Sequence, residues 1–239
     1  MERSEKKSKV VGEHQRACRV LVCFTGSVAS VKALEVVDSL LSMTYDVRVI
    51  VTDTAKRFVE VEALRKRTRA HYDGLREVLE AYAEDFPDGH PPSEPFVYDD
   101  QTEWRAWREV GDPVTHIELR KWADALVVAP LSANTLAKMA NGLCDTLLTC
   151  VWRAWDFADA SKSVFVAPAM NTAMWNSPFT AKHLAELAAF PNVHVIDPVE
   201  KTLACGDVGV GAMASPETVA RAVVENRTKR VGFPKNPSP

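Results

Sequence analysis

Small polar residues gather at two places where an apolar run gives way to a helical pattern. The segment FTGSVASVK contains Gly26 and Ser27, and the segment APLSANTLAK contains Ser132, Asn134 and Thr135. At the start of a helix, free N–H groups and the helix dipole favour an anion, and nearby hydroxyl groups can add hydrogen bonds. Both segments therefore indicate phosphate binding, although serine and threonine also cap helices that bind nothing.

The glycine spacing limits which phosphate compound these segments could hold. Neither segment has the G-x-G-x-x-G pattern of dinucleotide-binding turns, and the chain has no G-x-x-x-x-G-K-[ST] loop. A dinucleotide or a transferable triphosphate is therefore disfavoured. FMN fits these segments better than either, because its single phosphomonoester can be held by hydroxyl and backbone groups.

Two further segments place single functional groups beside apolar residues. In VAPAMNTAMWNSP, Asn171 follows a predicted strand and lies beside Met174 and Trp175, which is typical of a small-molecule pocket. The alternative is that Asn171 caps a turn and the apolar side chains belong to the core. In PVTHIELRKW, Thr115 is expected to cap a short helix with His116 in its first turn. His116 could take part in proton transfer, or it could have a surface or hydrogen-bonded structural role.

The segment KTLACGDVGVGAMASPE carries a cysteine, Cys205, among small residues. Such a loop could cradle a phosphate, hold a metal ion or move as a lid. The cysteines number five and none has C-x-x-C spacing, so a metal site is not expected. Cys205 lies among glycines and an aspartate, whereas the role of a small buried hydrophobe is expected for the other cysteines: Cys18, Cys23, Cys144 and Cys150.

These residues need a scaffold, and the apolar patterning predicts one. Short β-branched runs alternate with helical patterns, which implies a parallel, doubly wound α/β sheet in a single domain. Ligands bind such sheets beyond the carboxyl ends of the strands. Strands are predicted at 19–25, 46–52, near 96, 123–130, 163–169 and 193–196, and helices at 28–41, at 133–141 and from 216 onward.

The rest of the chain falls outside this alternation. Residues 1–17 are predicted to be a polar tail, 18–225 the folded domain, and 226–239 a disordered tail. Within the domain, residues 64–96 read as an insertion on the rim of the sheet, with a charged surface helix over 72–83 followed by a proline-rich loop.

Composition excludes several classes of protein. The 239 residues carry a net charge of −3, without the basic footprint usual in nucleic-acid-binding proteins. No apolar run approaches the ~20 residues that span a bilayer, so no membrane partner is expected. The polar N-terminus resembles neither a signal peptide nor a transit peptide, which makes a cytoplasmic location the expectation.

Four segments together resemble the flavin-dependent cysteine decarboxylases: GSVAS, HIELRKWADALVVAPLSANTLAKMANGLCDTLLTC, PAMNTAMW and LACGDVGVGAMA. The resemblance runs from about residue 19 to 225, interrupted by 64–96. It implies a Rossmann-like, flavodoxin-like fold that binds FMN. It also implies a homotrimer, or a multiple of trimers, with active sites at the subunit interfaces.

The resemblance also assigns roles to particular residues. His116 and Cys205 match the catalytic residues, with Cys205 on a flap that closes over substrate. Asn171 matches the residue that holds the substrate carboxylate, and Met174, Ala204 and Met213 are expected to lie near the substrate. The positions expected to contact FMN are Gly26, Ser27, Val28, Thr52, Phe58, Ser132, Ala133, Asn134, Thr135 and Ala169.

The reaction implied is decarboxylation of 4'-phospho-N-pantothenoylcysteine to 4'-phosphopantetheine, on the route to coenzyme A. The cysteine thiol would be oxidised, CO2 lost, and the resulting ene-thiol reduced again, with Cys205 as the final proton donor.

One alternative is a regulatory subunit of the same fold that inhibits a protein phosphatase. The chain lacks the long acidic tail frequent in such subunits. Another alternative is a peptidyl-cysteine decarboxylase. A flavin prenyltransferase is disfavoured by His116 and the cysteine-containing flap.

Overall fold

The computed structural model describes residues 18–43, 46–81, 96–202 and 208–231. In these ranges a parallel sheet has the strand order β3-β2-β1-β4-β5-β6. Each strand falls where the sequence predicts one, which confirms the doubly wound α/β class. The strands are β1 (Arg19–Phe24), β2 (Asp46–Val51), β3 (Val97–Tyr98), β4 (Ala125–Leu131), β5 (Ser163–Pro168) and β6 (Val193–Val195).

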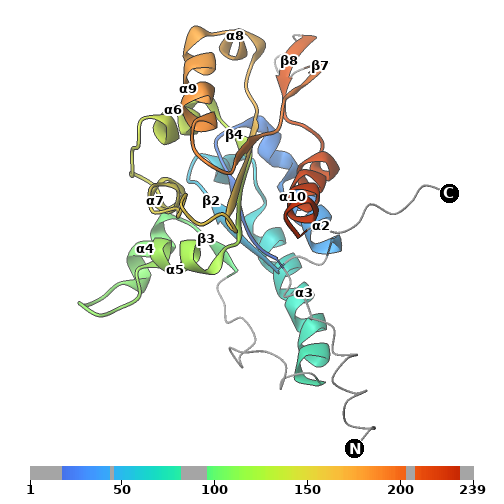
Figure 1. Ribbon diagram of the computed structural model, residues 1–239. Coiled ribbons are helices and arrows are strands. Elements are labelled where there is room, and N and C mark those ends of the chain that lie inside the picture. Colours follow the sequence, from blue (N-terminus) through green and yellow to red (C-terminus); the bar gives the residue numbers. More distant parts are fainter. Residues whose placement is uncertain (1–17, 44–45, 82–95, 203–207, 232–239) are drawn as a thin grey trace, which may run out of the picture.

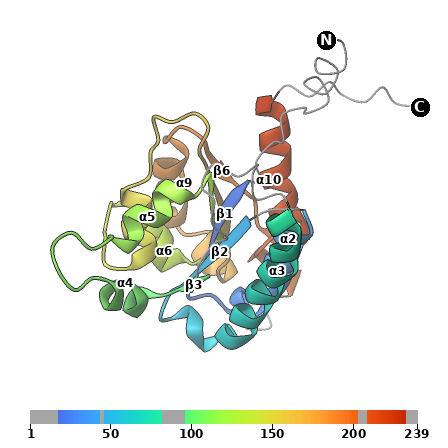
Figure 2. The same ribbon diagram turned by 90° about the horizontal axis from the view of Figure 1, so that it is seen from below.

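Helices cover both faces of the sheet (Figures 1 and 2). One face carries the 3-10 helix η1 (Val28–Lys32) with α2 (Ala33–Ser42), α3 (Val61–Ala81) and α10 (Pro216–Val231). The other carries α5 (Thr115–Trp122), α6 (Ala133–Ala140), α7 (Leu147–Arg153) and α9 (Pro178–Ala188). Because both faces are covered, β4 and β5 are buried along their whole length, and two separate apolar clusters form the core.

The neighbouring strands β1 and β4 mark the point where the sheet changes its direction of winding. The chain leaves β1 through η1 and α2 on one face, and leaves β4 through α6 on the other. In open α/β sheets, a ligand binds in the crevice that opens at such a switch point. The two predicted phosphate-binding segments, at Ser27 and Ser132, are the turns that flank it.

The segment that reads as an insertion belongs in large part to the regular fold. Helix α3 spans Val61–Ala81, rather than 72–83, and forms the crossover between β2 and β3. Leu64, Thr68 and Tyr72 recur every four residues and bury one face of this helix against the sheet. The charged residues between them hide this narrow apolar stripe. The proline-rich loop expected next lies outside the described residues.

The C-terminal third also differs from expectation. The small-residue segment forms most of an antiparallel hairpin of β7 (Val199–Thr202) and β8 (Val208–Ala212), where the sequence indicates only a loop. Helix α10 continues to Val231, past the predicted end of the domain, because the chain meets its next helix breaker only at Gly232. Within the described ranges, no helix is long and apolar enough to cross a membrane.

Candidate active site

A buried threonine joins the two strands at the switch point. The Thr25 hydroxyl donates to the Pro130 carbonyl oxygen at 2.7 Å and accepts from the Ser132 N–H at 2.8 Å. The Ser30 hydroxyl in turn donates to the Thr25 carbonyl oxygen at 2.7 Å. These bonds hold the turn after β1 and the turn after β4 in one fixed arrangement.

Both turns start a helix with a serine cap. The Ser27 hydroxyl accepts from the Ala29 N–H at 3.4 Å, and the Ser132 hydroxyl accepts from the Thr135 N–H at 3.3 Å. The capping alternative is therefore correct for both serines. Capping satisfies only part of the first turn of a helix, so further N–H groups face the carboxyl edge of the sheet. The arrangement offers an anion two neighbouring helix starts.

The other residues expected to contact FMN follow the same strand ends. Thr52 follows β2, and its N–H donates to the Phe24 carbonyl oxygen at 3.1 Å. Ala169 follows β5, and its N–H donates to the Leu131 carbonyl oxygen at 3.0 Å. Phe58 closes the short 3-10 helix η2 (Ala55–Arg57) that follows Thr52, and Val28, Ala133 and Asn134 begin the two capped helices.

A glycine allows these turns to lie close together. A Cβ atom at Gly26 would come within 2.5 Å of the Thr54 Cγ2 atom, so the turns after β1 and β2 touch at this point. The result is a cradle of small residues, hydroxyl groups and backbone N–H groups. This donor set fits a phosphomonoester such as that of FMN, because backbone N–H groups at helix starts favour an anion.

Asn171 lies at the end of β5 and starts the short helix α8 (Thr172–Trp175). Its side-chain oxygen accepts from the Ala173 N–H at 2.8 Å, so Asn171 does cap this turn. Met174 is 49% exposed, which contradicts the core alternative for this side chain, whereas Trp175 packs against the apolar cluster of that face. Met174 is therefore free to line a binding site.

The hairpin is anchored directly beside Asn171. The Met170 N–H donates to the Gly211 carbonyl oxygen at 2.9 Å. Gly211 has a φ of +143°, and a Cβ atom there would lie 2.3 Å from the Met170 carbonyl oxygen. Met213 continues from β8 and is buried in the core. Ala204 and Cys205 lie outside the described residues, in the stretch that joins the two hairpin strands.

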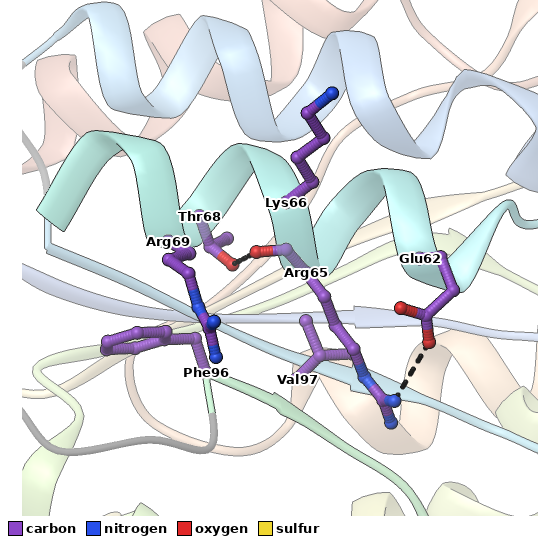
Figure 3. A pocket seen from close by; sticks show the side chains of 7 residues that line it. All are labelled: Glu62, Arg65, Lys66, Thr68, Arg69, Phe96 and Val97. Atoms are coloured by element: carbon purple, nitrogen blue, oxygen red, sulfur yellow. Dashed lines mark hydrogen bonds and ion pairs between the residues drawn. The ribbon is translucent and has the colours of Figure 1, made fainter. Parts of the chain in front are cut away.

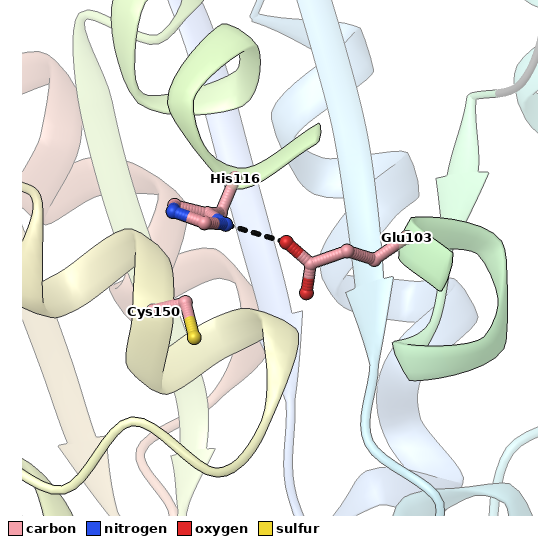
Figure 4. A group of neighbouring side chains, drawn as sticks. All are labelled: Glu103, His116 and Cys150. Carbon is pink, nitrogen blue, oxygen red and sulfur yellow. Dashed lines mark hydrogen bonds and ion pairs between the residues drawn. The ribbon is translucent and has the colours of Figure 1, made fainter. Parts of the chain in front are cut away.

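His116 forms a pair with a buried glutamate (Figure 4). It lies in the first turn of α5, as predicted, although Val114 rather than Thr115 is the N-cap residue. Its Nδ1 atom lies 2.5 Å from Oε1 of Glu103, which comes from helix α4 (Asp100–Ala106) and is only 8% exposed. The pair rules out the alternative of an unpartnered surface histidine, whereas a hydrogen-bonded structural role remains compatible with it.

A cysteine of α7 completes this cluster. The ligand atoms of Glu103, His116 and Cys150 all lie within 4.8 Å of one another. Burial, reinforced by the negative charge of Glu103, raises the pKa of the Cys150 thiol to about 11, so the group is a neutral thiol at physiological pH.

Cys18 and Cys23 are buried as expected, but Cys144 is exposed because it lies in the loop that leaves α6.

The site residues fall into two groups on one chain. Helix α5, with His116, packs on α4 and α7, whereas α8, behind Asn171, packs on α9 and β8. Figure 1 shows α5 and α8 well apart. The structure therefore brings Asn171 together with the hairpin, and His116 together with Glu103 and Cys150.

Sequence reasoning missed Glu103 and Thr25. Glu103 lies 13 residues from His116 along the chain and in a charged segment, so only tertiary packing reveals the pair. Thr25 did carry a signal, because a hydroxyl residue directly after a buried strand and before a glycine has to place its side chain at the switch point.

A separate cavity of about 520 Å³ lies between α3 and the start of β3 (Figure 3). The residues lining it differ from those expected in the active site and come mainly from the charged surface of α3. They are Glu62, Arg65, Lys66, Thr68, Arg69, Phe96 and Val97.

The fold and the site define a doubly wound α/β protein in which two serine-capped helix starts meet at the switch point of the sheet. The Flavoprotein family model matches residues 8–228, and the chain belongs to this family. The chain is 43% identical over 221 residues to "Phosphopantothenoylcysteine decarboxylase HAL3a" of Glycine max, covering 92% of this chain and 90% of the relative.

Solved structures show the same relationship. A cysteine-to-serine mutant of PPC decarboxylase complexed with pantothenoylaminoethenethiol is 43% identical, with a TM-score of 0.71, covering 88% of this chain and 98% of that chain. The FMN-binding protein AtHal3 is also 43% identical, with a TM-score of 0.67, covering 88% of this chain and 96% of that chain.

Proposed function

We propose that this protein is an FMN-dependent decarboxylase that converts 4'-phospho-N-pantothenoylcysteine to 4'-phosphopantetheine. The observation that carries the proposal is the cradle at Ser27 and Ser132 together with Asn171 and the hairpin beside it. Relatives over 40% identical along most of the chain are named for this activity, and one structural relative is named for FMN binding.

We infer that FMN occupies the cradle, with its phosphate at the two helix starts. The same carboxyl edge then positions the substrate. Asn171 would donate hydrogen bonds to the substrate carboxylate without adding a positive charge. A cation at this position would favour the charged ground state over a transition state in which the charge is dispersed, and so would slow the loss of CO2.

Decarboxylation of a plain cysteine derivative leaves a carbanion without an electron sink. Bound FMN would supply a two-electron oxidant that turns the cysteine side chain into a thioaldehyde, and would later return the electron pair. His116 would take up and release the proton of the thiol. Cys205, carried by the hairpin, would donate the proton needed when the ene-thiol is reduced. Closure of the hairpin would keep water from the intermediate.

The separation of His116 from Asn171 indicates how the site is completed. The segment that precedes His116 exposes several large apolar side chains: Trp104 is 74% exposed and Val110 is 94% exposed, and Trp107 and Val114 are exposed as well. Exposed apolar patches of this kind mark interaction surfaces. We propose that a homotrimer covers this patch and brings His116 of one copy to Asn171 of the next.

Incubation of the purified protein with 4'-phospho-N-pantothenoylcysteine tests the function. We expect yellow protein with an FMN spectrum, release of CO2, and 4'-phosphopantetheine by mass. His116→Asn should retain flavin but release no CO2. A peptide ending in cysteine is the comparison substrate. Efficient release of CO2 from the peptide alone would favour a peptidyl-cysteine decarboxylase, and folded protein that never takes up flavin would rule out the proposal.

A further inference from the structure

The pair formed by Glu103 and His116 has the geometry of a carboxylate that orients an imidazole. The Glu103 carboxylate meets Nδ1 at 2.5 Å, and Figure 4 shows the second ring nitrogen directed away from Glu103. A carboxylate only accepts hydrogen bonds, so Nδ1 has to carry a proton. In the neutral ring, Nε2 is then the nitrogen with a free lone pair.

Contacts within the protein hold Glu103 in place. Helix α4 starts with a capping box in which the Asp99 carboxylate accepts from the Thr102 N–H at 2.7 Å. Asp99 also pairs with Lys56 Nζ at 2.8 Å, which ties the helix to η2. On the other side, Asp100 accepts from the Leu147 N–H at 2.6 Å, which ties it to α7. A helix of seven residues thus has fixed contacts with two neighbouring elements.

The other ionisable groups around the pair do not compete for this role. Cys150 faces it from α7, and its raised pKa keeps it a neutral thiol. Asp100, on the same helix as Glu103, is engaged by the Leu147 N–H. Glu118, on the outer side of α5, pairs with Lys121 at 2.9 Å. Glu103 is therefore the acidic residue that contacts the His116 ring.

We propose that Glu103 is a positioning residue for the decarboxylase reaction. It holds His116 in the tautomer with the proton on Nδ1, presents Nε2 to the substrate, and offsets the charge of the imidazolium when Nε2 takes up a proton. The proposal rests on the proposed function, in which His116 handles the proton of the thiol. Buried acidic partners orient catalytic imidazoles in this way in other enzymes.

The test is the isosteric variant Glu103→Gln, with Glu118→Gln as the matched control. We expect Glu103→Gln to keep its flavin spectrum and KM and to lower kcat about 10- to 100-fold. The control should behave as wild type. Wild-type kcat in Glu103→Gln, in a protein whose His116→Asn variant is inactive, would overturn the positioning role and leave the proposed function intact. An inactive wild type would instead overturn the proposed function.

A direct measurement on the unmodified protein keeps the proposal testable even if Glu103→Gln does not fold. Proton–nitrogen NMR of protein labelled with 15N in histidine reports which ring nitrogen carries the proton, and His116→Asn identifies the signal. We expect the neutral His116 ring to be protonated on Nδ1. A neutral ring protonated on Nε2 would overturn the proposal whatever the catalytic results.

Discussion

At the scale of single residues, the chemistry depends on what surrounds each group. His116 and Asn171 could be identified from the sequence because each stands beside a predicted strand or helix start. The partner of His116 could not, because Glu103 is one of 32 acidic residues and only burial against α5 and α7 distinguishes it. Cys150 shows the same limit: nothing in its apolar segment reveals that it lies near two ionisable groups.

Cys205 gives the sharpest prediction at this scale. If it donates the proton of the last step, Cys205→Ser should still release CO2 but stall before reduction, because the hydroxyl is a far weaker acid than the thiol. Mass spectrometry should then show an unsaturated ene-thiol in place of 4'-phosphopantetheine. Cys144→Ser, at an exposed position outside the His116 cluster, is the control, and normal product from Cys205→Ser would remove Cys205 from the mechanism.

At the scale of elements, the sequence predicts strands better than it predicts the parts between them. Buried parallel strands are rich in apolar, β-branched residues, so β1 to β6 could be located from short runs of such residues in the sequence. The sequence predicts only the second half of helix α3, as a charged surface helix over 72–83, because charged residues outnumber the stripe of Leu64, Thr68 and Tyr72 that packs on the sheet. The sequence does not indicate the hairpin, because glycines are typical of loops. In the structure, the hairpin glycines instead allow close contact with Met170 and Thr172.

The contact of the hairpin with Met170 can be tested with two glycines. Gly211→Ala places a methyl group against the Met170 carbonyl oxygen at a positive φ, so we expect it to lower the free energy of unfolding by more than about 1 kcal/mol and to reduce kcat. Gly74→Ala is the control: it lies in α3 with open space around it, and alanine there should stabilise by about 0.5–1 kcal/mol. Urea unfolding measures the change in the free energy of unfolding for each variant. Equal changes in Gly211→Ala and Gly74→Ala would contradict the close contact of Gly211 with Met170.

The anchor of α4 predicts a pH dependence. Burial alone would raise the pKa of Asp99, but hydrogen bonds from Lys56 and Thr102 outweigh it and lower the pKa from 3.8 to about 2. A carboxyl group with a lowered pKa stabilises the fold above its unfolded pKa, and this contribution is lost as the pH falls from about 4 to about 2.

Asp99→Asn isolates this contribution. We expect the variant to be less stable than wild type by about 1 kcal/mol at neutral pH, and the difference to shrink as the pH falls towards 2. Asp53→Asn is the matched control, because Asp53 also pairs with Lys56, at 2.7 Å, but is 63% exposed. Urea unfolding at a series of pH values would measure the difference in free energy of unfolding between the variant and wild type. A difference that does not change with pH would contradict the role of the Asp99 charge.

At the scale of the whole molecule, one chain holds all the residues of the proposed site but does not gather them. The cradle, Asn171 and the hairpin lie together, whereas His116 and Glu103 lie beside the exposed patch of Trp104 and Val110. The sequence predicts the residues and the sheet that carries them. Their distribution over two surfaces follows from packing, and only a cyclic assembly of identical chains would unite them at every interface.

A site shared between copies predicts complementation. His116→Asn and Asn171→Ala should each be inactive alone. In trimers formed by co-expressing both variants, some interfaces combine an intact His116 with an intact Asn171, and random mixing makes this about a quarter of the sites. We therefore expect CO2 release to return to about a quarter of wild type. If both residues acted within one chain, every site would keep one defect and mixing would restore nothing.

Trp104→Arg, added to both variants, should abolish the recovery and give monomers by light scattering, because it places a charge in the patch. Ala185→Arg, on the exposed side of α9, should leave the trimer and the recovery unchanged.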